Sequence, residues 1–222
     1  LFDIQDVGTR FYTYIYTMAY AMEAAKENDI PFIVLDRPNP LGGVKVEGPV
    51  LETEYKSFVG NYEIPLRHGM TVGELARLFN EEFNIGADLT VVEMDRTMNY
   101  DETPLEFVMP SPNMPTLDTA FVYPGAALIE GTNVSEGRGT TKPFELIGAP
   151  FINSDDLSAE LNSLDLPGVK FRAASFTPTF SKHSGKLSHG IQIHITDYES
   201  FEPIVTGLHI VKTIHDMYPE DF

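Results

Sequence analysis

Hydrophobic positions in the first half of the chain follow two different periods. The short apolar run at 1–5, the continuous apolar run at 30–36 and the segment 88–95 are predicted to be strands, and the second is typical of a strand buried on both faces. Between the first two runs, apolar residues recur at spacings of three and four: Phe11, Ile15, Met18, Met22 and Ala25. This spacing predicts a helix with one apolar face, and the order strand, helix, strand predicts a parallel pair.

A second helix is predicted by its first turn. Thr71 and Glu74 have the spacing of a capping box, which predicts a helix that runs to about Phe83. The predicted parallel sheet has three strands at most, fewer than the ~5–6 usual for this architecture. The chain also opens on Leu1 inside a predicted strand, so we expect that N-terminal strands precede it.

The pattern changes after about residue 95. A Pro-rich stretch is followed by a helix from Thr116, and a further helix over 154–164 is predicted to be capped by Ser154. The remaining predicted elements are strands at 169–176 and 189–196 and a helix at 201–218. In the second strand, Ile191, Ile193 and Ile195 alternate with Gln192, His194 and Thr196, which predicts one buried face and one polar face. The predicted fold class is α/β: a Rossmann-like parallel sheet, incomplete at its N-terminus, over 1–95, then a smaller α+β domain over 96–222.

Composition and charge exclude several classes of function. The formal net charge of −18 and the pI near 4.5 create a field that repels nucleic acid and anionic membranes. The chain has no cysteine, which removes disulfides, thiolate metal sites and a cysteine nucleophile. No apolar stretch approaches the roughly 18 residues of a membrane span. No set of His, Glu or Cys has a metal-binding spacing, so we expect neither a metal nor a cofactor.

The stretch IEGTNVSEGRGTTKPFE at 129–145 has the glycines of a phosphate-binding loop. A P-loop requires four residues between its glycines and then lysine, whereas five residues separate Gly131 from Gly137 and Arg138 follows. A dinucleotide fingerprint fails too, since Lys142 stands at the third glycine position. Two interpretations remain open: a structural loop whose arginine pairs with a nearby glutamate, or a loop that binds a hydroxylated ligand.

Acidic and basic side chains follow two of the predicted strands. Asp6 is followed by Arg10, and Asp36 by Arg37 and Asn39. Ligands of open parallel sheets bind beyond the carboxyl ends of the strands, so these residues are candidates for a site. The structural alternative is that both aspartates cap the turns that follow them. Tyr residues at 12, 14 and 16 are explained by helix packing, or one of them stacks on a sugar.

Several segments resemble the DUF1343 family, whose characterised members are NamZ-type exo-β-N-acetylmuramidases. They are FDIQDVGTRFYTYIYTM, LDRPNPLGG, VEGP, PSPNMPTLDTAFVYPG, EGTNVSEGRGTTKPFELIGAP and FTPTFSKHSGK. The resemblance extends from residue 1 to the C-terminal helix. It implies a Rossmann-like domain, a smaller α+β domain and a pocket between them. It also implies that the family's catalytic glutamate precedes Leu1, so that this chain holds part of an active site.

The implied reaction releases N-acetylmuramic acid from the non-reducing end of peptidoglycan fragments, in cell-wall turnover and recycling. The implied location is the cell envelope or the exterior, which is the periplasm in a Gram-negative host; the oligomeric state stays open. Glycoside hydrolysis requires two carboxyl groups. The candidates for supporting this chemistry are Asp6, Asp36, Glu130 and Glu136.

The substrate carries a lactyl carboxylate, which an arginine fork suits. Arg10, Arg37 and Arg138 are the arginines of the matched segments, and we expect one of them to bind this group. The other binding candidates carry hydroxyl, amide or carboxylate groups: Tyr14, Asn39, Glu47, Asn113, Asn133, Thr140 and Thr141. Two alternatives stay open, a dinucleotide-dependent oxidoreductase with its fingerprint outside this chain and a sugar-binding module without activity.

Overall fold

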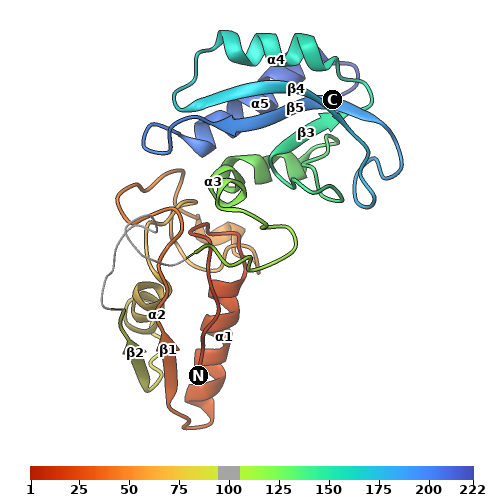
Figure 1. The fold of residues 1–222 in the computed structure, drawn as a ribbon. Coiled ribbons are helices and arrows are strands. Elements are labelled where there is room, and N and C mark those ends of the chain that lie inside the picture. The colour runs from red at the N-terminus through yellow and green to blue at the C-terminus, as the bar shows by residue number, and fades with distance from the viewer. Residues whose placement is uncertain (95–105) are drawn as a thin grey trace. The chain divides into compact units, whose positions relative to one another are not determined.

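A computed structural model describes residues 1–94 and 106–222 of the chain. The chain forms two compact units, Leu1–Pro110 and Ser111–Phe222 (Figure 1). The domain boundary predicted near residue 95 lies outside the described residues. The first unit contains a parallel sheet with helices and the second a small antiparallel sheet with helices, which confirms the predicted fold class. No described helix has the length and apolar character needed to cross a membrane.

The first unit is built around a short parallel sheet. Its elements are α1 (Tyr14–Glu27), β1 (Phe32–Leu35), the 3₁₀ helix η1 (Thr53–Tyr55), α2 (Val72–Glu81) and β2 (Leu89–Val92). β1 and β2 pair in parallel. Residues 1–5, predicted to be a strand, contribute a single parallel bridge between Phe2 and Val34. The predicted order of parallel segments is therefore present, although the first segment pairs with β1 only around Phe2.

Helices α1 and α2 bury the apolar positions that the periodicity selects. Ile15, Met18, Met22 and Ala25 lie in the core of the first unit, whereas Phe11 precedes the helix. The capping box of α2 is confirmed, since the Thr71 hydroxyl accepts from the Glu74 N–H and the Glu74 carboxylate accepts from the Thr71 N–H. The local signals of this unit thus agree with its tertiary packing.

The second unit consists of a three-stranded antiparallel sheet with helices around it (Figure 1). Its elements are α3 (Leu117–Ala126), the 3₁₀ helix η3 (Ala127–Gly131), β3 (Leu146–Ala149), α4 (Ser154–Ser163), β4 (Val169–Phe176), β5 (Ser188–Ile195) and α5 (Pro203–Met217). The strand order is β3-β5-β4. β3 was not predicted. It contains Gly148, where a Cβ would lie 2.4 Å from the carbonyl oxygen of His189 on β5.

Two details of the second unit differ from the sequence prediction. The cap of α4 is Asn153, whose side chain accepts from the first-turn N–H groups, and not Ser154. The Ser154 hydroxyl instead donates to the carbonyl of Ala174 (2.9 Å) and accepts from the Gly190 N–H (3.0 Å). Gln192, predicted to be on a polar face, is buried because its side-chain oxygen accepts from Arg172.

Candidate functional site

Asp6 lies just beyond the segment that pairs with β1, and its side chain is buried. Its Oδ2 accepts from the Gly8 N–H (2.7 Å) and from Nε2 of His68 (3.1 Å). Because Nδ1 of His68 accepts from the Met70 N–H (3.2 Å), Nε2 is the ring nitrogen that donates to Asp6. Asp6 Oδ1 has no hydrogen-bond partner among the described residues. The carboxylate thus caps a turn and orients a buried histidine.

Asp36 lies at the carboxyl end of β1 and holds the start of α2. Its Oδ1 accepts from the backbone N–H groups of Arg37 (2.9 Å) and Gly73 (2.7 Å), and its Oδ2 accepts from the Thr71 hydroxyl (3.1 Å). A Cβ at position 73 would lie 2.7 Å from the Asp36 carboxyl carbon, so the contact depends on glycine. The carboxylate satisfies N–H groups that a helix start leaves unpaired.

Arg10 is buried and donates to backbone carbonyls. Its Nη1 bonds the oxygens of Pro49 (2.8 Å) and Ile64 (2.7 Å), which ties the loop after β1 to the segment before α2. Burial of the guanidinium lowers its pKa from the usual value. Within the described residues, these contacts give Arg10 a structural role.

Asn39 and Glu47 also form structural contacts, in the loop that follows β1. The side-chain oxygen of Asn39 accepts from the Leu41 N–H (2.9 Å), and its amide donates to the Met70 carbonyl (3.0 Å). The Glu47 carboxylate pairs with Arg67 at 2.5 Å, with both side chains largely buried. These candidate binding residues therefore shape the loop.

A cavity of about 480 Å³ lies beside the strand ends of the first unit. Its walls include Asp3, Gln5, Tyr14, Arg37, Glu106 and the segment 107–110. Arg37 is half-exposed and forms an ion pair with Asp3. The Tyr14 ring packs edge-on against Tyr12, with 4.8 Å between centroids. Of the candidate binding residues, Tyr14 and Arg37 are therefore the two that the structure brings to one cavity.

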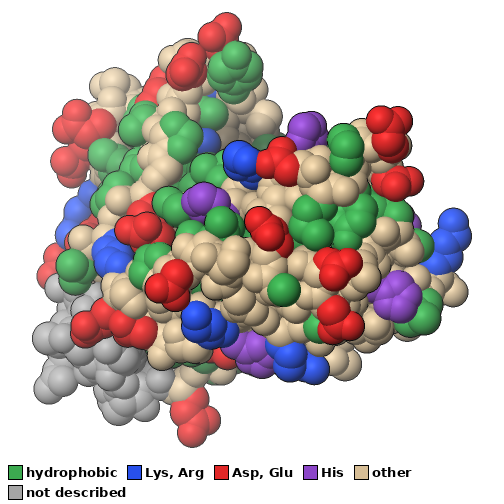
Figure 2. All heavy atoms as spheres, turned by 90° about the horizontal axis from the view of Figure 1, so that it is seen from above, with side chains coloured by type: hydrophobic (Ala, Val, Ile, Leu, Met, Phe, Trp, Pro, Cys, Tyr) green, Lys and Arg blue, Asp and Glu red, His purple; other side chains and the backbone are tan. Residues whose placement is uncertain are grey.

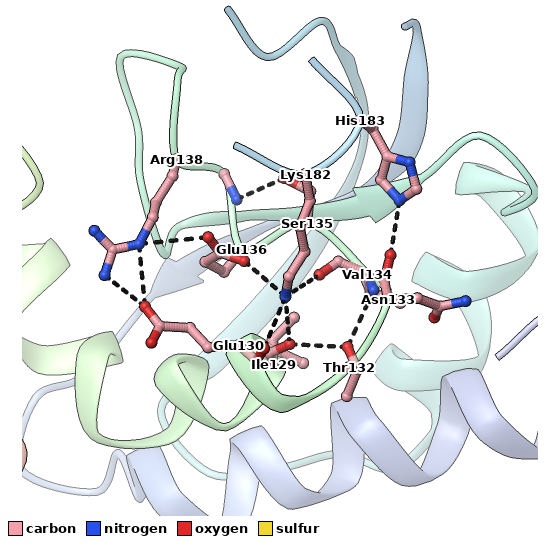
Figure 3. Close-up of polar contacts among 11 residues, drawn as sticks. Ile129, Glu130, Thr132, Asn133, Val134, Ser135, Glu136, Arg138, Lys182 and His183 are labelled. Atoms are coloured by element: carbon pink, nitrogen blue, oxygen red, sulfur yellow. Dashed lines mark hydrogen bonds and ion pairs between the residues drawn. The ribbon is translucent and has the colours of Figure 1, made fainter. Parts of the chain in front are cut away.

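In the second unit, two carboxylates and two cations form one charge cluster (Figure 3). The Arg138 guanidinium pairs with the exposed Glu130 (2.5 Å) and, through Nε, with the buried Glu136 (3.4 Å). Nζ of Lys182 lies 3.1 Å from Oε2 of Glu136. The guanidinium also lies 5.0 Å from the centroid of the Phe144 ring, within the range of a cation–π contact. The pairing of Arg138 with a nearby glutamate agrees with the first interpretation of this segment, that of a structural loop.

Lys182 connects two loops through hydrogen bonds and an ion pair. Besides its ion pair, its ammonium donates to the carbonyls of Ile129 (2.9 Å), Glu130 (3.1 Å) and Val134 (3.0 Å), as Figure 3 shows. These acceptors belong to the segment that the sequence selected, whereas Lys182 belongs to the loop between β4 and β5. The lysine therefore holds the conformation of the acidic loop.

The two neighbours of Lys182 have left-handed backbone conformations. Ser181 has φ 69° and His183 has φ 57°, which are uncommon for residues other than glycine. His183 Nε2 lies 2.7 Å from the Asn133 carbonyl oxygen, and the Asn133 amide donates to the Asp221 carbonyl (2.6 Å). Asn133, a candidate binding residue, thus connects the acidic loop to the chain after α5.

The remaining binding candidates of this unit occupy turns. The Thr140 hydroxyl donates to the Gly137 carbonyl (2.7 Å), and Thr141 is exposed on the same turn. Asn113 is half-buried in the turn 111–114. Within the described residues, no group of three or more His, Asp or Glu side chains is arranged to hold a metal ion.

Sequence analysis missed His68, Lys182 and Glu145. Glu145 is buried and accepts from the Thr119 hydroxyl (2.7 Å) and the Lys142 ammonium (2.5 Å). His68 lies 62 positions from its partner Asp6, and no spacing rule connects residues that far apart. Of the contacts of Glu145, only its pair with Lys142 is local, because these two residues are three positions apart.

Comparison with known proteins gives consistent results. Two family models match the chain: exo-β-N-acetylmuramidase NamZ, N-terminal, over residues 1–118 and exo-β-N-acetylmuramidase NamZ, C-terminal, over residues 121–222. Over 225 residues the chain is 72% identical to the peptidoglycan β-N-acetylmuramidase NamZ of Bacillus subtilis strain 168. That alignment covers 100% of this chain and 54% of the relative, so the chain spans about half the relative's length.

Two crystal structures of DUF1343 family proteins from Bacteroides fragilis have similar folds. The first has a TM-score of 0.91 at 40% identity, and the second a TM-score of 0.71 at 34% identity. Each comparison covers 99% of this chain and 59% of the solved chain.

Proposed function

Because the chain belongs to the exo-β-N-acetylmuramidase NamZ family, we propose that the protein hydrolyses peptidoglycan fragments and releases N-acetylmuramic acid from their non-reducing end. The observation that carries this proposal is the high identity to a peptidoglycan β-N-acetylmuramidase along the whole chain. Such a reaction belongs to cell-wall turnover and recycling, and we propose that the protein acts in the cell envelope or outside the cell, where this substrate is found.

The cavity of the first unit has walls that suit this sugar. Arg37 offers a guanidinium fork to the lactyl carboxylate, and the Tyr14 ring offers an aromatic face to the pyranose. The segment 107–110 supplies an apolar wall for the acetyl methyl group. Arg37 is already paired with Asp3, but exposed ion pairs contribute little, so exchange of Asp3 for a substrate carboxylate costs little.

The four candidate carboxylates have different roles in this proposal. Asp6 and Asp36 are buried and accept from backbone N–H groups, so we assign them the positioning of the strand-end turns. Glu136 is buried between two cations, whereas Glu130 is exposed and accessible to a sugar hydroxyl. Asp3 and Glu106 are the carboxylates that line the cavity.

The experiment tests the role of Arg37 in the intact protein. It compares hydrolysis of a chromogenic N-acetylmuraminide with that of the matching N-acetylglucosaminide, which lacks the lactyl group. Arg77→Ala is the matched control, because the Arg77 side chain is 44% exposed against 40% for Arg37 and also pairs with one carboxylate.

The expected result is that Arg37→Ala loses the preference for the muraminide and Arg77→Ala keeps it. A preference that survives Arg37→Ala would remove Arg37 from the site. Failure of the wild-type protein to hydrolyse the muraminide would contradict the proposed function itself.

A further inference from the structure

The loop between β1 and α2 presents a concentrated set of exposed apolar side chains. Every residue from 52 to 59 is exposed, and the set includes three large residues with more than half of their surface accessible: Tyr55, Phe58 and Val59. Single exposed apolar residues are normal on protein surfaces, but a set on one short segment marks a binding surface.

This exposed segment contains a turn that is closed by backbone hydrogen bonds. Ser57 and Gly60 close a tight turn through two backbone hydrogen bonds, N–H to carbonyl, of 2.8 and 3.0 Å, and Phe58 and Val59 form its tip. Just beyond the turn, Tyr62 is buried and stacks on Phe79 with 4.3 Å between ring centroids. The core therefore anchors the base of the turn, while its aromatic tip is left to solvent.

The aromatic rings of this surface have a regular arrangement. Phe58 lies parallel to Tyr20 of α1, with ring centroids 6.2 Å apart and planes within 8°. Both side chains keep about half of their surface exposed, and Tyr55 is 67% exposed. Half-exposed aromatic rings suit a flat ligand whose C–H bonds point at them, which is how pyranose rings contact aromatic side chains.

Polar groups on the same segment determine which class of ligand can bind there. Glu52 and Glu54 are exposed on the same segment, and Glu63 accepts from the Thr53 hydroxyl (2.8 Å) and pairs with Lys56 (3.4 Å). These carboxylates repel phosphate groups. The face drawn in Figure 2 likewise carries acidic side chains scattered among hydrophobic and basic ones. A dry protein contact would desolvate these charges, whereas sugar hydroxyls hydrogen-bond to them.

We propose that Tyr20, Tyr55 and Phe58 form a stacking surface for neutral N-acetylated sugars of a glycan strand. The choice of glycan as the ligand rests on the proposed function, because peptidoglycan alternates N-acetylglucosamine with N-acetylmuramic acid. The surface itself rests on the exposed rings, the hydrogen-bonded turn and the exposed carboxylates of the same segment. It binds the uncharged sugar face, and the nearby carboxylates accept from its hydroxyls.

The test is a binding titration of the intact protein with the β-1,4-linked tetramer of N-acetylglucosamine, followed by calorimetry and by tyrosine fluorescence. Phe58→Ser and Tyr55→Ser remove one ring each, and Tyr55→Phe keeps the ring. Phe180→Ser is the matched control, since Phe180 is a phenylalanine of similar exposure, 55% against 51% for Phe58, in the second unit.

We expect each serine variant at the turn to bind the tetramer about three- to tenfold more weakly, the contribution of one aromatic contact. Phe180→Ser and Tyr55→Phe are expected to bind like the wild type. Thermal unfolding of each variant confirms that the fold is retained, as expected for exposed side chains.

Three results would overturn the proposal: no binding of the tetramer by the wild type, equal binding by Phe58→Ser, or a concentration-dependent dimer that Phe58→Ser abolishes. The last would make the turn a contact between two copies of the chain. Hydrolysis of the muraminide by the intact protein is measured separately. Its failure would remove the proposed function and leave the binding result standing.

Discussion

Asp36 of the first unit and Glu136 of the second are buried carboxylates held by different kinds of partner. In the first unit, Asp36 accepts from two backbone N–H groups and one hydroxyl, all of them neutral donors. In the second unit, Glu136 lies between the charged groups of Lys182 and Arg138. The first arrangement depends on the direction of hydrogen bonds at a helix start, and the second on the balance of charges between two loops.

This difference predicts how each of the two sites responds to substitution and to salt. A neutral donor set is local and insensitive to salt, because it carries no net charge to screen. A charge cluster is more sensitive to loss of one member, because a buried charge without its partner is costly. Four predictions test the comparison, from the largest expected effect to the smallest.

Replacement of Lys182 is expected to have the largest effect. Lys182→Met leaves the buried Glu136 with Arg138 alone and removes the donor to three backbone carbonyls. We expect the free energy of unfolding to fall by about 3 kcal/mol, as for other broken buried pairs. Urea denaturation measures the change. Lys212→Met, which removes an exposed lysine of α5, serves as the control and should leave the midpoint unchanged.

Replacement of Asp36 is expected to have the next largest effect. Asp36→Ala leaves the N–H groups of Gly73 and Arg37 without this acceptor, which should cost about 2 kcal/mol. Hydrogen exchange of the first-turn amides of α2 measures the local loss. Asp36→Asn keeps one acceptor oxygen and should show a smaller change. Equal stability of Asp36→Ala and the wild type would mean that the cap contributes nothing.

A pH-dependent effect is expected from the aromatic core of the first unit. Burial, with the nearby Glu23 carboxylate as a second cause, raises the pKa of Tyr62 from 10.0 to about 12. The raised pKa means that Tyr62 stabilises the fold fully below about pH 10 and loses this contribution as the pH rises toward about 12. Thermal unfolding across this interval measures the slope. Tyr62→Phe should flatten it, and an unchanged slope would assign the alkaline loss to other groups.

Removal of Arg138 is expected to have the smallest effect. Its side chain is 30% exposed, and Glu136 keeps Lys182 as a partner, so Arg138→Ala should cost about 1 kcal/mol. The cost should shrink in molar salt, because salt screens a partly exposed pair. Asp36→Asn should show no such salt dependence. A loss at Arg138 that is the same at low and high salt would contradict an electrostatic origin.

Sequence patterns predicted most elements whose signals are local. The capping box at Thr71 and Glu74 and the apolar face of α1 need only residues three or four positions apart. The cap of α4 was misassigned to Ser154 because Asn153 and Ser154 are both good caps and adjacent in the chain. The hydroxyl of Ser154 instead bonds β4 and β5, which local rules do not detect.

The candidate site was predicted less completely than the fold. The strand-end rule selected Asp6, Asp36 and Arg37, but the structure shows both aspartates buried in hydrogen bonds and only the arginine in a cavity. Side chains of one strand-end segment point in different directions, and their spacing along the chain does not say which of them face a ligand.

By itself, the sequence determined the order of helices and strands, the acidic character, the absence of cysteine chemistry and the resemblance that led to the family. These properties depend on short-range periodicity, on composition and on contiguous motifs. Tertiary structure alone decided which polar groups meet, as in the pairs Asp6–His68 and Glu136–Lys182. It also left the aromatic turn at Phe58 exposed. The reason is that burial and pairing depend on segments distant in the chain, whose approach is set by packing of the whole unit.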